Sequence, residues 1–461
     1  MNRTRISHFL AIAVAILLAG CAAGKNFQSA GPQPGEITLA VTDTPPSGLT
    51  FLAAQVTVTK AVLNPGNVSV LAAPQTIELT RLQTDTGLLS VSSAPAGTYS
   101  SMTLTFSNLT LTLENDTGSN LMIGGLTCPP GPNSFCSGFP TATNLSSTFA
   151  VPSFTLASGG GAGLLIDVNL NNLLSSSLTA DFQNGVTISQ LTPSGGNVLA
   201  AAEDVSGQVT TVGAAQSTFT LQSGTHNYLL TADNTTAFIN FPSNLCTTPS
   251  MACVQAGEML NVDISLETSG ILVAKNVIFE DATSSEPEIE GVIISLNSGT
   301  RQITIIPLME SPSVSGVSIG SLIAVQYSGV TTFDIDFSPA STTGFSFASP
   351  ADLLVGQEVQ VRCASTPPGT INADRVRLRS SRLTANVQSV AAGTITLNNL
   401  PSLFSTHGIS LIQARTSSAT IFAGKATGIT QIFLNDSLSV RGPLFANLGS
   451  PTLTSTKVFK H

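Results

Sequence analysis

The chain has no tryptophan, three tyrosines and four histidines among its 461 residues, and only 9% of the residues are charged. The 17 Lys and Arg residues are outnumbered by 26 Asp and Glu residues, which excludes the basic surface that nucleic-acid binding requires. A disordered chain would carry more charge and fewer aliphatic residues. The chain should therefore fold, and its many β-branched residues, together with 39 Gly and 25 Pro, predict an all-β protein with short strands.

Signatures of catalysis are also missing. The histidines lie far apart in the sequence, at His8, His226, His407 and His461, so they form no His-Glu-x-x-His or similar metal motif. No Gly-x-Ser-x-Gly pentad occurs, and the glycine run at 159–163 lacks the Lys-Ser/Thr ending of a phosphate-binding loop. We therefore expect no catalytic residues, no metal and no cofactor. Paired carboxylates of a glycan hydrolase would leave no local signature, so that alternative stays open.

The amino terminus has the form of an export signal. Two arginines precede an apolar run from Phe9 to Leu18, which is too short to span a bilayer and is followed by Ala-Gly-Cys21. This ending resembles the bacterial lipobox, in which the cysteine receives a diacylglyceryl group and the preceding peptide is removed. The resemblance implies a signal peptide at 1–20, lipidation of Cys21 and a membrane partner bound through the lipid. Ala22, where an aspartate would retain the protein at the inner membrane, favours the outer membrane of a diderm bacterium; the alternative is an ordinary secretory signal with a chance cysteine.

Four of the other cysteines fall into two short Pro-bearing loops. Cys128 and Cys136 enclose one loop, and Cys246 and Cys253 enclose the other. Exported proteins retain disulfides, so we predict two local disulfides, each stabilising the fold by about 2–3 kcal/mol. A zinc site is the alternative, but the spacings do not match short metal-binding knuckles. Cys363 is left over, and it is either buried or paired between chains.

A small, Pro- and Gly-rich stretch at 21–35 predicts a flexible tether, and a first domain is expected at 36–202. Four segments in this domain resemble a bacterial family of exported domains of unknown function, family 4382. These segments are Thr42-Asp43 with Pro45, Val56–Val62, Pro95–Tyr99 and Asp167–Leu170. The resemblance implies a β-sandwich-like fold and no established activity.

The rest of the chain repeats itself. Residues 256–281 align without a gap on 355–380, so that Gly257 matches Gly356 and Val262 matches Val361. A third, divergent copy ends the chain, and a Thr-to-Phe element recurs in all three copies, at Thr235–Phe238, Thr331–Phe333 and Thr420–Phe422. This pattern predicts three small β-barrel repeats at 203–283, 284–382 and 383–461, lying distal to the lipid. The units resemble domain-of-unknown-function family 5666, whose architecture resembles oligonucleotide/oligosaccharide-binding barrels in shape only.

Acidic residues form three groups in these repeats: Glu203-Asp204, then Glu286, Glu288 and Glu290, and finally Asp334 and Asp336. Residues two apart on a strand face the same side, so Asp334 and Asp336 could hold a calcium ion with help from carbonyl oxygens. A solvated strand face is the reading that the pattern favours.

The expected function is that of a lipid-anchored cell-envelope protein with a non-catalytic binding or scaffolding role. Its partner would be an envelope protein or a polysaccharide, although the few aromatic rings weaken the case for sugar stacking. A structural spacer or adhesin-like stalk and, less favoured, a hydrolase are the alternatives. The sequence leaves the ligand, the binding face and the oligomeric state open.

Overall fold

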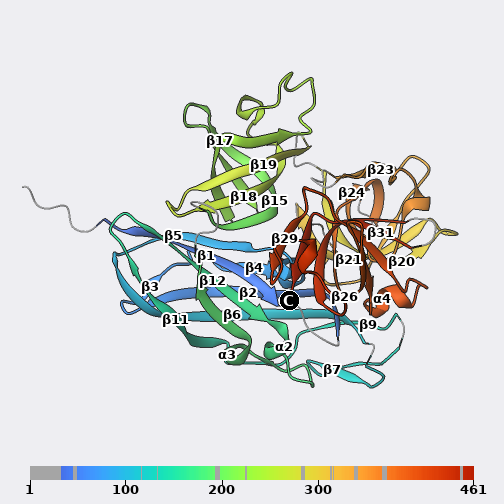
Figure 1. The fold of residues 1–461 in the computed structure, drawn as a ribbon, viewed down its shortest axis with the longest axis horizontal. Helices are drawn as coiled ribbons and strands as arrows, with labels where there is room; N and C mark the ends of the chain where they lie inside the picture. The colour runs from blue at the N-terminus through green and yellow to red at the C-terminus, as the bar shows by residue number, and fades with distance from the viewer. Residues whose placement is uncertain are drawn as a thin grey trace, which may run out of the picture.

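The fold is nearly all β in a computed structural model of the chain (Figure 1). The structure describes residues 33–44, 49–115, 117–131, 133–192, 198–223, 226–281, 286–311, 314, 316–336, 341–365, 371–446 and 450–461. The predicted fold class is confirmed: a sandwich-like first domain precedes three small barrel-like units. The predicted signal peptide, Cys21 and most of the tether lie outside the described residues. In the described ranges, no helix is long and apolar enough to cross a membrane.

Two sheets form the first domain. The first sheet has the order β14 (Val186–Gln190), β12 (Gly161–Asn169), β1 (Gly35–Thr44) and β5 (Gly87–Ala94), with β1 and β12 parallel. The second has the order β11 (Ser146–Leu156), β6 (Gly97–Glu114), β2 (Thr50–Asn64) and β3 (Val68–Ser69), and β4 (Gln75–Glu78) and β9 (Phe135–Gly138) pair with β2 and β6. Small elements complete the domain: η1 (Leu79–Gln83), β7 (Leu121–Ile123), β8 (Leu126–Cys128), β10 (Ala142–Thr143), α2 (Leu170–Leu173), β13 (Ala180–Asp181) and α3 (Phe182–Gly185).

Strand β6 shows how the sequence builds this sandwich. Apolar residues alternate with polar ones along the strand, so that one face is buried in the core. At Asn108, whose φ is 52°, one extra residue enters the pairing with β2 and the alternation changes phase. The inward residues are Met102, Leu104 and Phe106 before this bulge and Leu109, Leu111 and Leu113 after it. The bulge thus keeps the apolar face of an 18-residue strand directed at the core.

Barrel 1 is a closed ring of five strands: β15 (Val198–Gly213), β16 (Thr218–Ser223), β17 (His226–Ile239), β19 (Leu272–Asp281) and β18 (Met259–Glu267). In barrel 2, pairings close a ring of β20 (Glu288–Asn297), β21 (Gln302–Ser311), β22 (Ile323–Gln326), β25 (Ile371–Leu378) and β24 (Glu358–Ser365), and β23 (Thr332–Ile335) pairs with β25. In barrel 3, the ring consists of β26 (Ser380–Ala391), β27 (Thr394–Asn398), β28 (Ile412–Arg415), β31 (Thr452–Thr454) and β30 (Ser437–Phe445), with β32 (Lys457–Lys460), β29 (Ile421–Gly424) and α4 (Ser402–Ser405) beside it. Short 3₁₀ turns are η2 (Ala214–Gln216), η3 (Met251–Cys253), η4 (Pro350–Asp352) and η5 (Ile429–Gln431).

The recurring Thr-to-Phe element has one structural role in the three barrels. In each barrel the threonine hydroxyl donates a hydrogen bond of 2.7 Å to a carbonyl at the start of the last strand or just before it. The three pairs are Thr236 with Ala274, Thr331 with Ala373, and Thr420 with Ser455. The following phenylalanine pairs in parallel with a valine of that last strand in all three copies. The motif is therefore a structural clasp that ties the segment carrying the phenylalanine to the last strand of each barrel.

The three barrels pack against the first domain. Figure 1 shows them gathered on one side of the first domain, with the C-terminus among the four units. An apolar core joins strand β2 to barrels 2 and 3, because burying these side chains removes apolar surface from water. Its buried members are Leu52, Ala53, Ile294, Ile306, Leu308, Val355 and Leu403.

Candidate functional site

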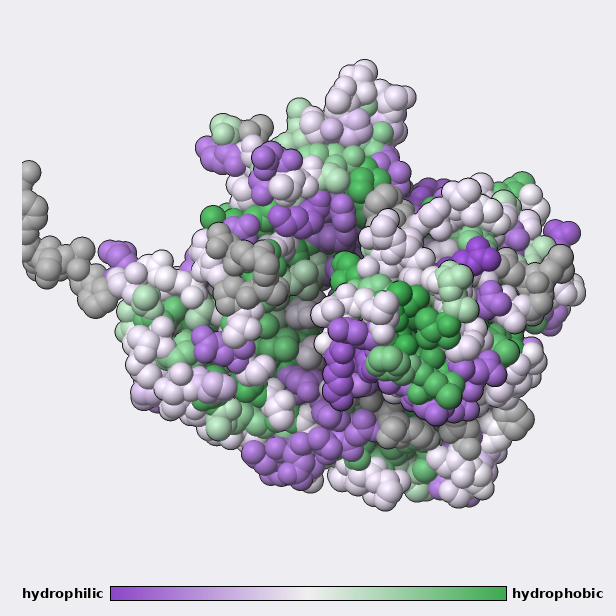
Figure 2. All heavy atoms as spheres, viewed as in Figure 1, coloured by the Kyte–Doolittle hydropathy of each residue, from purple (hydrophilic) through white to green (hydrophobic). Residues whose placement is uncertain are grey.

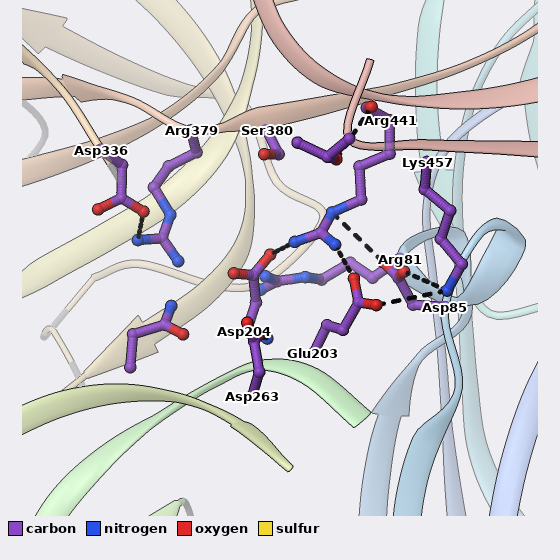
Figure 3. Close-up of polar contacts among 12 residues, drawn as sticks. Arg81, Asp85, Glu203, Asp204, Asp263, Asp336, Arg379, Ser380, Arg441 and Lys457 are labelled. Carbon is purple, nitrogen blue, oxygen red and sulfur yellow. Dashed lines mark hydrogen bonds and ion pairs between the residues drawn. The ribbon is translucent and has the colours of Figure 1, made fainter. Parts of the chain in front are cut away.

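Charged side chains from all four units meet in one buried cluster (Figure 3). We call this set the junction cluster. Its acids are Asp85, Glu203, Asp204, Glu280, Glu290, Asp336 and Glu358, and its bases are Arg81, Arg379, Arg382, Arg441 and Lys457. In a chain with so few charges, this concentration makes the junction the main polar feature of the interior.

One group of the cluster surrounds Arg379, which lies between β25 and β26 with 2% of its side chain exposed. Its guanidinium Nη1 lies 3.1 Å from Glu280 Oε1 of barrel 1 and 2.5 Å from Asp336 Oδ2 of barrel 2. Glu290 of β20 lies 3.7 Å from Arg379 Nε and 3.0 Å from Arg81 of the first domain. This group therefore joins the first domain to barrels 1 and 2.

The second group surrounds Arg382 and Arg441 of barrel 3. Arg382 bonds to Glu358 of barrel 2 at 2.8 Å and to Asp85 of the first domain at 3.2 Å. Arg441 pairs with Glu203 and Asp204 of barrel 1. Lys457 bridges the first domain and barrel 1 through Asp85 and Glu203, at 3.3 and 3.6 Å.

The two groups meet at Glu290 of β20 and Glu358 of β24, which lie on neighbouring paired strands, two positions apart in the register, and so on the same face. Their like charges repel each other, which favours a proton on one of the two carboxyl groups. Burial raises the pKa of Glu358 to about 7, despite the nearby Arg382. Burial acts in the same direction on Glu290, but Arg81 and Arg379 outweigh it and lower its pKa to about 2. Glu358 is therefore the proton carrier of this pair.

The other acids of the cluster also fall into two kinds, those with raised and those with lowered pKa values. Burial raises the pKa of Asp336 to about 6 and raises the pKa values of Glu203 and Glu280. Burial also opposes ionisation of Asp85, but Arg441, Lys457 and Arg382 prevail and lower its pKa to about 2. The cluster thus contains both fixed negative charges and carboxyl groups that favour the neutral form.

One ion pair of the cluster joins matching positions of two repeats. Glu280 and Arg379 are separated by 99 residues, the same offset that aligns barrel 1 on barrel 2. Each residue follows the last strand's inward valine, Val277 or Val376, by three positions. Opposite charges at equivalent positions hold the ends of consecutive barrels together.

Two cavities flank the junction. The Phe404 cavity, of about 700 Å³, lies between the first domain and barrels 2 and 3, and its lining includes Phe51, Asn386 and Phe404. The Tyr228 cavity, of about 930 Å³, lies mainly between the first domain and barrel 1, and the Tyr228 hydroxyl donates to Leu88 O at 3.3 Å beside it. Arg81 and Arg382 line both cavities. Figure 2 shows a largely pale surface, consistent with the low charge, that is indented where the units meet.

The acidic groups singled out in the sequence are mostly paired with arginines. Asp334 bonds to Arg377 at 2.9 Å and Asp336 bonds to Arg379, so each carboxylate has a guanidinium partner instead of a shared calcium ion. Asp336 has 9% of its side chain exposed, which also corrects the expectation of a solvated strand face at that position. Within the described residues, no group of three or more His, Cys, Asp or Glu side chains is placed to hold a metal ion.

Glu203-Asp204 and Glu290 belong to the junction cluster, whereas Glu288 pairs with Arg375 at 2.5 Å and Glu286 with Arg362 at 3.0 Å. Each of these acids therefore has an arginine partner. A sequence signal for them did exist: Arg375, Arg377 and Arg379 stand at alternating positions, which places them on one face of a strand.

The cysteines lie where local disulfides were predicted. Cys128 bonds to Cys136 and Cys246 bonds to Cys253, with Cα–Cα distances of 5.7 and 5.5 Å. Cys363 is buried without a disulfide partner, and burial raises its thiol pKa to about 12, so it is a poor nucleophile. His407 bonds to Leu403 O at 2.9 Å, within its own loop.

Comparison with known proteins identifies one part of the chain. Residues 34–200 match the family model "Domain of unknown function (DUF4382)". The first domain is a DUF4382 domain. No curated protein matches the chain.

Among solved structures, the chain has a likeness to a multidomain protein with nucleic acid binding domains from Streptococcus pneumoniae TIGR4. The identity is 8%, the match covers 54% of this chain and 72% of that chain, and the TM-score is 0.11. A TM-score this low carries no argument about fold or function.

Proposed function

We propose that this protein is a lipid-anchored binding protein of the cell envelope and that its ligand is a short neutral glycan held in the Phe404 cavity. The observation that carries the proposal is the cavity itself, which three structural units build together and which is rimmed by neutral hydrogen-bonding groups. Sites of this size between domains are the usual place for a small ligand.

The lining of the cavity favours a neutral ligand rich in hydroxyl groups. Amide and hydroxyl side chains from the first domain and barrel 3 face it, among them Gln83, Asn171, Thr384, Asn386, Asn399 and Ser437. The charged lining residues Arg81, Arg382 and Glu358 are already paired within the junction cluster. A ligand with its own net charge would therefore find no free counter-ion among the described lining residues. Phe51 and Phe404 add apolar surface for the faces of sugar rings.

The alternatives fit the geometry less well. A hydrolase that uses two carboxyl groups needs them about 5–10 Å apart across the scissile bond. Among the described lining residues of the Phe404 cavity, Glu358 has the one acidic side chain, and it is paired with Arg382. A stalk would extend its repeats, whereas these barrels pack against the first domain.

The test is calorimetric titration of the full-length protein in detergent with neutral and anionic oligosaccharides of two to six sugars. We expect saturable binding of a neutral glycan, a rise in Kd of about tenfold in Asn386→Ala, which corresponds to one good hydrogen bond, and no change in Asn227→Ala, an exposed position of barrel 1. Absence of saturable binding, or equal affinity in Asn386→Ala, overturns the proposal. Release of new reducing ends from the bound glycan would instead support the hydrolase.

Lipid anchoring rests on the sequence around Cys21. In the producing bacterium, the wild-type chain should fractionate with outer membranes and incorporate labelled fatty acid. Cys21→Ser should lose the label and keep its signal peptide. If Cys21→Ser is processed and fractionates as the wild type does, the cysteine is not the anchor.

A further inference from the structure

The junction cluster contains more acids than bases. The group around Arg379 has three acids for two bases, and the group around Arg382 and Arg441 has four acids for three bases. Each group thus carries one uncompensated acid. A buried net charge is costly, so the docked structure is most stable when one acid of each group is neutral.

We propose that the junction cluster is a proton-dependent lock, which holds the three barrels on the first domain while one carboxyl group in each of its two groups is protonated and loosens as those protons leave. The proton on Glu358 is the central one, because Glu358 of β24 and Glu290 of β20 lie on neighbouring paired strands where the two groups meet. This inference does not depend on which ligand the cavities hold.

The geometry favours protons over a metal ion as the neutralising species. Each carboxylate of the cluster contacts a guanidinium or an ammonium group, and no described set of three acids converges as a metal site. Two buried oxygens, Glu290 Oε2 and Asp336 Oδ1, have no hydrogen-bond partner among the described residues, and they belong to different acids.

Other charged groups lie against the cluster. Some are balanced by a partner of opposite charge, and one is an acid whose neutral form is favoured by burial. Arg375 with Glu288 and Arg377 with Asp334 form separate pairs on barrel 2. Asp263 of barrel 1 accepts hydrogen bonds from Asn276 and from the Asp204 backbone amide, and burial raises its pKa. An additional acid beside the cluster increases the demand for protons.

The direction of the pH effect follows from the two kinds of acid. Two acids have raised pKa values in the docked protein, Glu358 at about 7 and Asp336 at about 6. When the units separate, these carboxyl groups return to their ordinary pKa values of 4.5 and 3.8 and lose their protons at a lower pH. They stabilise docking fully below those ordinary values, and this contribution is lost as the pH rises to about 7. Asp85 and Glu290, with pKa values of about 2, stabilise docking above their ordinary values and lose that contribution in acid. Docking should be firmest near pH 4–5 and weaker at pH 8.

Loosening of the junction cluster would affect both cavities. Arg81 and Arg382 line the Phe404 and Tyr228 cavities and also belong to the lock. Loosening the lock would separate the walls of both cavities at once. The structure thus couples the pH of the surrounding medium to access between the units.

The experiment is hydrogen–deuterium exchange of the full-length protein in detergent from pH 5 to pH 8, with each rate divided by its intrinsic rate at the same pH. Protection of β15, β20 and β26 should fall at least tenfold over this range, because the release of one proton changes the docking equilibrium about tenfold for each step of one pH unit. Protection of the β6 core should stay constant. Glu358→Gln combined with Asp336→Asn replaces the two proton-holding acids by neutral amides, and its profile should vary less than threefold.

Asp334→Asn is the matched control, because Asp334 is 41% exposed and lies outside the lock; it should keep the wild-type profile. A second readout needs no variant: infrared difference spectra between pH 5 and pH 8 should show loss of protonated carboxyl carbonyl. A flat wild-type profile, no carboxyl signal, or an unchanged profile in the double variant overturns the lock. So does abolition of the pH dependence by added calcium, which would put a cation in the protons' place.

Discussion

Arg379→Met should lower the free energy of the first unfolding transition by about 3–5 kcal/mol at pH 7, the usual cost of breaking a buried ion pair from one side. Methionine keeps most of the length and apolar stem of the arginine but removes the cation. The guanidinium has 2% exposure and contacts Glu280, Glu290 and Asp336. Its loss leaves these three buried acids with Arg81, which contacts Glu290, as the one base of their group.

The loss should depend on pH in a defined direction. Glu280 and Asp336 have raised pKa values through burial, and removing Arg379 raises them further because that cation opposes the shift. At pH 5 the stranded acids can take up protons, so the variant should recover part of its stability there. The difference from the wild type should therefore grow from pH 5 to pH 8.

Urea unfolding of the full-length protein in detergent, followed by circular dichroism, measures this effect. Arg362→Met is the matched control, since Arg362 has 25% exposure and its partners Glu286 and Asp374 have 49% and 30%. A pair exposed to that degree should cost less than about 1 kcal/mol. Equal losses in the two variants, or a loss in Arg379→Met that shrinks as the pH rises, would contradict this prediction.

Two further predictions concern a local disulfide and the threonine hydrogen bond of the Thr-to-Phe element. Cys128→Ser with Cys136→Ser should lower the free energy of unfolding by about 2–3 kcal/mol, because the unfolded chain gains conformational freedom across a separation of eight residues. Urea unfolding against the oxidised wild type measures this loss, and the two proteins should match when both are fully reduced, since reduction also opens Cys246–Cys253. Thr331→Val should cost about 1–3 kcal/mol, because its buried hydroxyl donates to Ala373 O at 2.7 Å and accepts from the Ser328 amide at 2.8 Å. The control is Thr332→Val, because Thr332 is the next residue and is exposed; it should change the free energy of unfolding by less than about 0.5 kcal/mol. Equal losses of stability in the two threonine variants would contradict the role of Thr331 in the clasp.

Local pattern was enough to predict much of this architecture. Alternating apolar residues mark strands because side chains point to opposite faces at every step, and the repeated Gly, Val and Thr-to-Phe positions mark equivalent sites in the three barrels. The first-domain segments around Asp43, Val56, Tyr99 and Asp167 lie in the region that matches DUF4382. The strand β15 begins at Val198, a few residues before the predicted boundary at 203, because its early part already pairs with β18.

The junction cluster was beyond the reach of that reasoning, even though its residues were visible. Glu203-Asp204, Glu290 and Asp336 are visible in the sequence as acidic groups, and a solvated strand face was the favoured interpretation for Asp336. The arginine run of β25 offered a hint, since charges on alternating positions share a face. A pattern of this kind shows that a charged face exists but does not show what covers it.

The strands, the three repeats and the short-range cysteine pairs can be read from local sequence patterns, because periodicity and proximity along the chain are local properties. The packing of the barrels on the first domain, and the contact of Asp85 with Lys457 across 372 residues, are seen in the three-dimensional structure only. Such contacts depend on how four complete surfaces fit together, so no short segment encodes them. The same docking buries the charges and shifts their pKa values, which is why the proton balance of the junction belongs to the fold and not to any one stretch of chain.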